Sequence, residues 1–189
     1  TLELSLPSWI PGSYMVRDFA KSIIDINITT GANSENEHLS MLPIVKLDKQ
    51  TWRVETLGKP CTIRYSVYAN DLSIRSAFMN DQYAFINGTS AFLKVSEFEN
   101  ARCELQIKLN ENDPEITDWK AYTSMPTRAD SASSSKWYFV AQSYDEFIDH
   151  PIYVGIADTH CFNVHGVSLT SLLSSNTDID YQLIANYVL

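Results

Sequence analysis

The chain has 189 residues, of which 44% are hydrophobic and 20% are charged, as expected for an ordinary globular domain with one full core. Its formal net charge of −9 argues against nucleic-acid binding, which needs a basic surface, and against docking on anionic membranes. The longest apolar runs are far too short to span a bilayer, and Thr1 does not open a signal-peptide pattern. We therefore expect neither a nucleic acid nor a membrane among the partners.

The three cysteines are too widely spaced for a disulfide framework or a zinc knuckle. Cys61 and Cys103 lie in alternating patterns, so we expect them to be buried as small hydrophobic residues, and Cys161 stands apart. This usage fits a reducing compartment such as the cytoplasm and leaves a periplasmic or secreted protein open.

The stretch from Leu6 to Ala20 gathers turn, aromatic and charged residues. Those that set it apart are Trp9, Pro11, Gly12, Tyr14, Arg17 and Asp18. Pro11-Gly12 predicts a sharp turn, because proline presets φ at one central position and glycine accepts a positive φ at the next.

Two interpretations of this stretch stay open. In the first, it is a structural corner in which Trp9 and Tyr14 bury their rings. Arg17 would then pair with its neighbour Asp18. In the second, the loop forms one wall of a binding site or an interface, since loops on rigid scaffolds often carry function.

Alternating apolar and polar residues predict half-buried strands along most of the chain. These segments are residues 22–30, 51–57, 61–69, 85–95, 102–110 and 136–142. The turn Gly58-Lys59-Pro60 between the second and third segments predicts a hairpin. Asn87-Gly88 interrupts the fourth segment and predicts a turn or a bulge.

The pattern changes near the C-terminal end. Ser143 and Glu146 form a capping box, which predicts a helix that Pro151 stops after barely two turns. Short strands are predicted around residues 152–154 and 161–169. From Thr177 onward, apolar residues at helical spacing predict a second helix, which is cut off at Leu189. Because that apolar stripe lacks its partner surface, we expect it to fray or to form a weak dimer.

Mostly antiparallel strands at short spacing predict an all-β fold. We expect an antiparallel β-sandwich or a twisted pair of sheets, with one short helix and the truncated C-terminal helix.

Five segments, in chain order, resemble the N-terminal domain of the glycyl aminopeptidase family of zinc metallopeptidases. They are LPSWIPGSYMVRDFAKSI (6–23), KLDKQTWRV (46–54), YSVYANDLSIRSA (65–77), FINGTSAFLKV (85–95) and YDEFIDHPIYVG (144–155). The resemblance implies an N-terminal β domain, then a thermolysin-like catalytic domain with zinc, then a PDZ-type domain. Residues 1–173 would form the β domain and 174–189 would begin the catalytic domain, so we interpret the chain as a piece of a longer protein.

The zinc site of such peptidases needs an HExxH helix. The histidines are His38, His150, His160 and His165; none is followed by Glu, and no pair has the i, i+4 spacing. The five-residue spacing of His160 and His165 would place them on opposite faces of a strand. No G-x-S-x-G motif occurs either. We therefore expect no catalytic residue, metal or cofactor in this chain, and the zinc would lie in the catalytic domain of the longer protein.

In related two-domain aminopeptidases the β domain supplies part of the substrate wall, including a polar side chain near the amine of the peptide. By position, the resemblance suggests Asn87, Gly88 and Thr89 for this role. The alternative is a β-bulge that needs Gly88 for a positive φ.

These observations favour a non-catalytic N-terminal β domain that packs on its own catalytic domain and helps wall the cleft for a peptide substrate. The rival hypothesis is a free-standing β-sandwich module that binds a peptide or a glycan through its surface aromatic residues.

Overall fold

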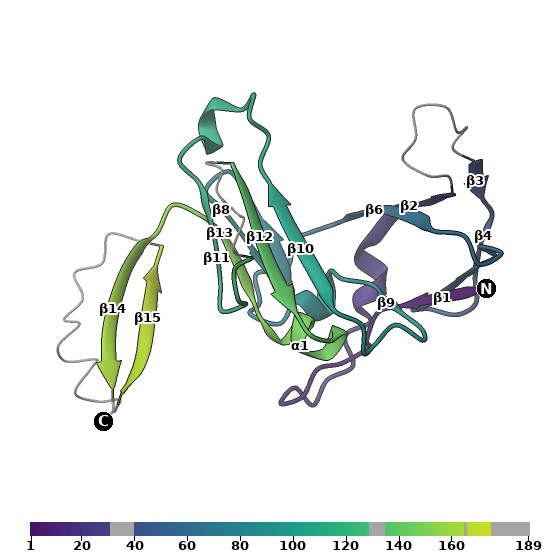
Figure 1. The fold of residues 1–189 in the computed structure, drawn as a ribbon, viewed down its shortest axis with the longest axis horizontal. Coiled ribbons are helices and arrows are strands. Elements are labelled where there is room, and N and C mark those ends of the chain that lie inside the picture. The colour runs from purple at the N-terminus through teal and green to yellow at the C-terminus, as the bar shows by residue number, and fades with distance from the viewer. Residues whose placement is uncertain (31–39, 129–134, 165, 175–189) are drawn as a thin grey trace.

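The computed structural model describes residues 1–30, 40–128, 135–164 and 166–174. They form mostly antiparallel strands with one α-helix, arranged as two halves and a separate hairpin (Figure 1). The predicted all-β fold is confirmed. Within the described ranges, no helix is both long enough and apolar enough to cross a membrane.

The first half contains two sheets. One has the order β4 (Ile44–Lys46), β5 (Thr51–Val54), β1 (Leu2–Ser5) and β9 (Lys94–Val95). The other has the order β3 (Ser40–Leu42), β2 (Ile23–Thr30) and β6 (Cys61–Val67). The core of the first half lies between these sheets and consists of Leu4, Leu6, Phe19, Ala20, Ile28, Trp52 and Val54. The alternation of the sequence explains these strands, since every second side chain faces this core.

The second half has a separate core. A four-stranded sheet runs β11 (Lys120–Thr123), β13 (Ile152–Gly155), β8 (Tyr83–Ile86) and β7 (Ala77–Met79). Beside it lies the antiparallel pair β10 (Cys103–Lys108) and β12 (Lys136–Ala141). The buried core residues are Ala84, Trp119, Ala121, Met125, Phe139, Ala141, Ile152 and Val154.

The helices of the described residues are all short. The 3-10 helices are η1 (Phe19–Ser22), η2 (Gly88–Ser90) and η3 (Pro114–Ile116), and the α-helix is α1 (Tyr144–Asp149). The predicted cap of α1 is confirmed: the Glu146 amide donates to Ser143 Oγ at 3.1 Å. Glu146 Oε2 in turn accepts from the Gln142 amide at 2.6 Å, one residue before the position expected in a capping box.

The predicted hairpin across Gly58 is wrong. A tight turn does form there, with the Lys59 amide donating to Thr56 O at 3.0 Å and Gly58 at φ 73°. The strands on either side of the turn, however, belong to different sheets: β5 pairs with β1 and β4, whereas β6 pairs with β2. β2 has eight residues and β6 has seven, so β2 is a longer partner for β6 than β5 would be.

The last two described strands form a hairpin that projects from the body (Figure 1). β14 (Asp158–Val164) and β15 (Val167–Leu173) pair only with each other within the described residues. The sequence predicted a single strand around residues 161–169. In the structure this range contains the end of β14 and the beginning of β15. The predicted helix from Thr177 to Leu189 lies outside the described residues.

Candidate functional site

Three of the segments that resemble the peptidase family meet around a cavity of about 410 Å³. We call it the opening-loop cavity. Its lining comes from the opening loop and η1 (Met15, Val16, Arg17, Phe19, Lys21 and Ser22), from residues Val67, Tyr68, Asn70, Asp71, Ser76 and Ala77, and from Ser90 of η2. The fold thus joins stretches that are far apart in the sequence.

The turn at the tip of the opening loop is confirmed. The Ser13 amide donates to Ile10 O at 3.1 Å, and Gly12 has φ 78°. Proline before a glycine with positive φ is the arrangement of a type II turn.

The side chains on this loop are not buried as the corner interpretation requires. Trp9 is 56% exposed and Tyr14 is fully exposed. The expectation that these rings are buried is therefore wrong, because the loop projects beyond both sheets and no described element covers it (Figure 1).

Arg17 and Asp18 do not form the expected pair. Arg17 Nε donates to Ser13 Oγ at 3.4 Å, and its backbone amide donates to Ser8 O at 2.7 Å. Asp18, at φ 46°, places its carboxylate 3.9 Å from Lys49 Nζ. The left-handed backbone of Asp18 turns its side chain away from Arg17 and toward the first half.

Asn87 connects two walls of the cavity. Its Oδ1 accepts from the Thr89 amide at 3.1 Å, and its Nδ2 donates to Ile74 O at 3.2 Å. Its backbone amide also donates to Ser76 O at 2.9 Å. Asn87 therefore caps η2 and holds the loop before β7 against it.

Gly88 is needed for close approach and not for a positive φ. Its φ lies outside the positive range, so the predicted bulge is wrong. A Cβ on Gly88 would lie 2.8 Å from Ile148 Cα, which brings η2 directly against α1. Gly88 and Thr89 are buried behind the cavity wall, and Ser90 is the residue of η2 that lines the cavity.

Two tyrosines, the half-buried Tyr65 and the buried Tyr144, fix the segment after η2. Tyr65 OH donates to Ala91 O at 2.8 Å, and Tyr144 OH donates to Phe92 O at 2.9 Å. Burial raises the pKa of both hydroxyls, and their mutual charge adds to the rise in pKa at Tyr144. Both therefore remain protonated donors at neutral pH.

The sequence pattern alone indicates no role for the residues between Tyr68 and Ala77. Asp71 Oδ2 accepts from Ser76 Oγ at 2.9 Å, and the Asp71 amide donates to Ala77 O at 3.2 Å. Asp71 and Ser76 both lie in residues 65–77, the third segment that resembles the peptidase family, and this resemblance is the sequence signal that points to them. With Arg17 and Lys21 on the facing wall, the lining offers charges of both signs, a setting suited to binding a polar chain end.

No three His, Cys, Asp or Glu side chains gather as a metal site in the part of the chain that the structure describes. His150 Nδ1 lies 2.6 Å from Ser124 Oγ, and His160 is exposed on β14. His38 and His165 lie outside the described residues.

Comparison with known proteins places the chain in a family. A family model described as the peptidase M61 N-terminal domain matches residues 1–156. A crystal structure of an aminopeptidase N family protein from Idiomarina loihiensis is similar, with a TM-score of 0.85 and 35% sequence identity. The match covers 99% of this chain and 30% of that one, so the chain spans less than a third of its solved relative. A search of curated proteins gave no match. The chain therefore belongs to the peptidase M61 family, as the N-terminal domain of a glycyl aminopeptidase-like protein.

Proposed function

We propose that this domain packs on the catalytic domain of a zinc-dependent aminopeptidase and helps to wall its substrate cleft. The zinc would be held by that catalytic domain. The observation that carries the proposal is the surface around the opening-loop cavity, where large apolar side chains are exposed beside a lining that carries Arg17, Lys21 and Asp71.

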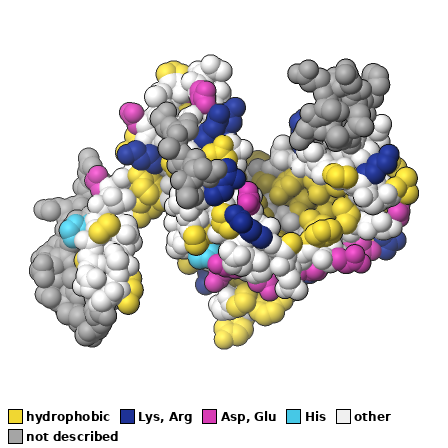
Figure 2. Space-filling view, viewed as in Figure 1, with side chains coloured by type: hydrophobic (Ala, Val, Ile, Leu, Met, Phe, Trp, Pro, Cys, Tyr) yellow, Lys and Arg dark blue, Asp and Glu magenta, His cyan; other side chains and the backbone are white. Residues whose placement is uncertain are grey.

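We use the name apolar rim for the large exposed apolar side chains on the segments that line the cavity or adjoin its lining. They come from the opening loop (Trp9, Tyr14, Met15 and Val16) and from the segment before and within β7 (Tyr68, Leu72, Ile74 and Met79). Met15, Val16 and Tyr68 also line the cavity. Figure 2 shows hydrophobic side chains gathered at the tip of the opening loop, at the bottom of the view. Apolar surface of this extent is typical of an interface rather than of a solvated face.

The hairpin β14–β15 supports the same arrangement. A two-stranded hairpin is marginally stable on its own in water, and both outer edges of this one are unpaired in the described chain. We expect it to gain strands or a covering surface from the catalytic domain. The boundary at residues 173 and 174 stays a prediction; the family model ends at residue 156, before β14 begins.

Within the cleft, the cavity would meet one end of a peptide substrate. Asp71, held by Ser76, could pair with an ammonium group, and Arg17 and Lys21 could pair with carboxylates. Asn87, Gly88 and Thr89 would act from behind the wall, by holding η2 and the loop before β7 in position.

The experiment uses the full-length peptidase with Ile74→Glu in the apolar rim and, as a matched control, Met41→Glu on β3. Both side chains are exposed, so neither change should unfold the domain. We expect Ile74→Glu to lower kcat/KM on peptide substrates about tenfold or more, equivalent to about 1.4 kcal/mol, since a buried carboxylate would disturb the packing. Met41→Glu should leave kcat/KM unchanged. Equal kcat/KM values for both variants and the unmodified enzyme would contradict the proposal.

A further inference from the structure

A second cavity, apolar and about 630 Å³ in volume, lies between the two halves of the domain. We call it the apolar hollow. Its lining consists of Leu2, Thr56, Gly58, Lys59, Pro60, Cys61, Ile63, Leu93, Val95, Phe98, Ala101, Arg102, Cys103, Tyr144 and Phe147. Figure 2 shows hydrophobic side chains facing the hollowed region between the halves. The volume falls within the roughly 300–1,000 Å³ range of small-molecule sites.

Both cores contribute to the walls of the hollow. Ile63 and Leu93 pack against the core of the first half, and Phe147 packs against that of the second. Phe98 stands at the edge with 56% of its surface exposed. Because the walls belong to different cores, a ligand in the hollow would bridge the two halves.

The interior of the hollow offers apolar surface and almost no free polar group. Tyr144 OH is already engaged with Phe92 O at 2.9 Å, so the tyrosine presents its ring. Among the described residues, no buried side-chain nitrogen or oxygen lacks a hydrogen-bond partner. The body of a fitting ligand must therefore be apolar.

The charge of the lining is positive. Lys59 and Arg102 are the only charged side chains among the described residues that line it, in a chain whose net charge is −9. Both residues are exposed, so their charged groups lie on the solvent side of the hollow. Arg102 Nη2 contacts Glu104 Oε1 at 3.0 Å, and Lys59 makes no ion pair within the described chain. This charge favours a ligand with an anionic head.

We propose that the apolar hollow binds a long-chain fatty carboxylate. The alkyl chain lies between the two cores, and the carboxylate lies at the mouth beside Lys59 and Arg102. Each buried methylene should strengthen binding about fourfold until the hollow is filled. This proposal is independent of the packing and cleft role of the opening-loop cavity, which lies elsewhere and shares no lining residue with the hollow.

The cysteines provide a readout within the chain. Cys61 and Cys103 line the hollow, whereas Cys161 is exposed on β14, and all three are free. A bound alkyl chain should shield the first two thiols from alkylation and leave Cys161 reactive. Cys161 is thus an internal control for any effect of the ligand on the reagent.

The experiment measures the alkylation rate of each cysteine in the whole chain, with dodecanoate kept below its micelle concentration. We expect at least tenfold protection of Cys61 and Cys103 and none at Cys161. Decanoate should bind about fifteenfold more weakly than dodecanoate, since it lacks two methylenes. Dodecyltrimethylammonium, which has a similar tail and a cationic head, should give little protection.

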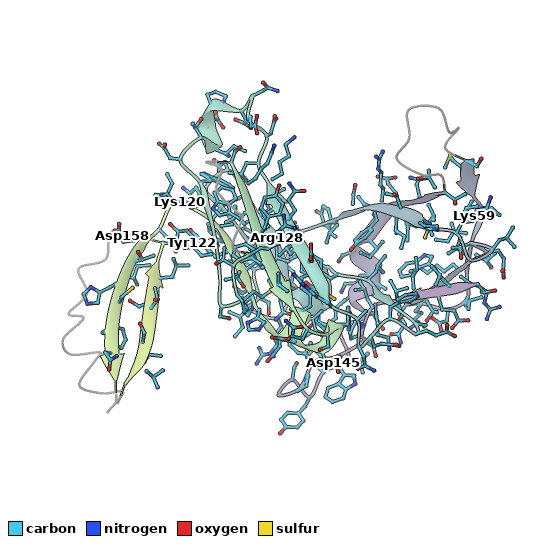
Figure 3. The ribbon with its side chains drawn as sticks, viewed as in Figure 1. Lys59, Lys120, Tyr122, Arg128, Asp145 and Asp158 are labelled. Carbon is cyan, nitrogen blue, oxygen red and sulfur yellow. The ribbon has the colours of Figure 1, made fainter. Side chains whose placement is uncertain are left out.

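Two exposed variants test the head and tail contacts without disturbing a core. Lys59→Glu should weaken dodecanoate binding about fivefold, the effect of one exposed charge pair. Lys120→Glu, on the far side of the molecule from Lys59, is the matched control and should not change it (Figure 3). Phe98→Asp should weaken binding about tenfold. Equal protection at Cys161, equal binding of the cationic amphiphile, or alkylation of Cys61 and Cys103 that dodecanoate does not slow would overturn the proposal.

Discussion

Gly88→Ala tests the contact between η2 and α1, which holds the candidate site against the second half. The new Cβ would lie 2.8 Å from Ile148 Cα, 3.2 Å from Ile148 O and 3.1 Å from Phe92 Cδ2. Two of these three neighbours are backbone atoms of α1, so the helix itself must move. The Phe92 ring cannot move freely either, because it stacks on Phe147 with 4.4 Å between centroids.

The magnitude follows from two opposing effects. Overpacking of this kind costs about 1–3 kcal/mol, and backbone neighbours place this site at the upper end. Replacing glycine by alanine also restricts the unfolded chain, which stabilises by about 0.4–1 kcal/mol where the backbone conformation is compatible, as it is at Gly88. We therefore expect a net loss of about 2 kcal/mol in the free energy of unfolding.

Urea unfolding measures this loss as a lower midpoint at an unchanged m-value. Gly12→Ala is the control, because it has nothing within 4 Å but a φ of +78°, so its cost of about 1 kcal/mol arises from the backbone alone. Gly12→Asn should recover most of that cost, since asparagine tolerates the left-handed region, whereas no small side chain should rescue position 88. A Gly88→Ala protein as stable as the unmodified chain would refute the close approach of η2 and α1.

Three further predictions concern other parts of the chain. Trp9→Ala should cost less than about 1 kcal/mol in thermal unfolding, because the ring is exposed, whereas a core aromatic would cost about 3–5 kcal/mol. Stability should fall above about pH 10, by at most about 1.4 kcal/mol per pH unit for each of the two tyrosines, because burial raises the pKa values of Tyr65 and Tyr144 only in the folded state. Below that pH both hydroxyls are protonated in both states, and Tyr144→Phe should make the alkaline decline shallower. Elemental analysis after dialysis should find no stoichiometric zinc, because the described residues hold no cluster of metal ligands; one zinc per chain would contradict this prediction.

The sequence predicted the local features that depend on nearby residues. The turn at Gly12 and the cap at Ser143 follow from the conformational preferences of two to four residues, and both formed. The alternating patterns likewise placed strands such as β2, β6 and β10. The pairing of those strands could not be predicted from the sequence, because a tight turn at Gly58 is compatible both with a hairpin and with a chain that crosses from one sheet to the other.

The candidate site was predicted only in part. Trp9 and Tyr14 looked like core aromatics, because the sequence does not show that their loop projects past both sheets. Gly88 was identified for the wrong reason, since the approach of Ile148 comes from a helix sixty residues further along the chain. Asp71 and Ser76 lie in a segment that resembles the peptidase family, but only the fold shows that they line one cavity with Arg17 and Ser90.

The most direct test of the proposed role is hydroxyl-radical footprinting of the opening-loop cavity in two proteins. The 189-residue chain is compared with the full-length peptidase, and oxidation is measured at Trp9, Tyr14, Met15 and Met79, with Met41 on β3 as the control. All five side chains are exposed in the isolated domain. We predict at least fivefold slower oxidation of the four rim residues in the full-length protein and an unchanged rate at Met41. Equal oxidation of the rim in both proteins would contradict packing of this surface on the catalytic domain.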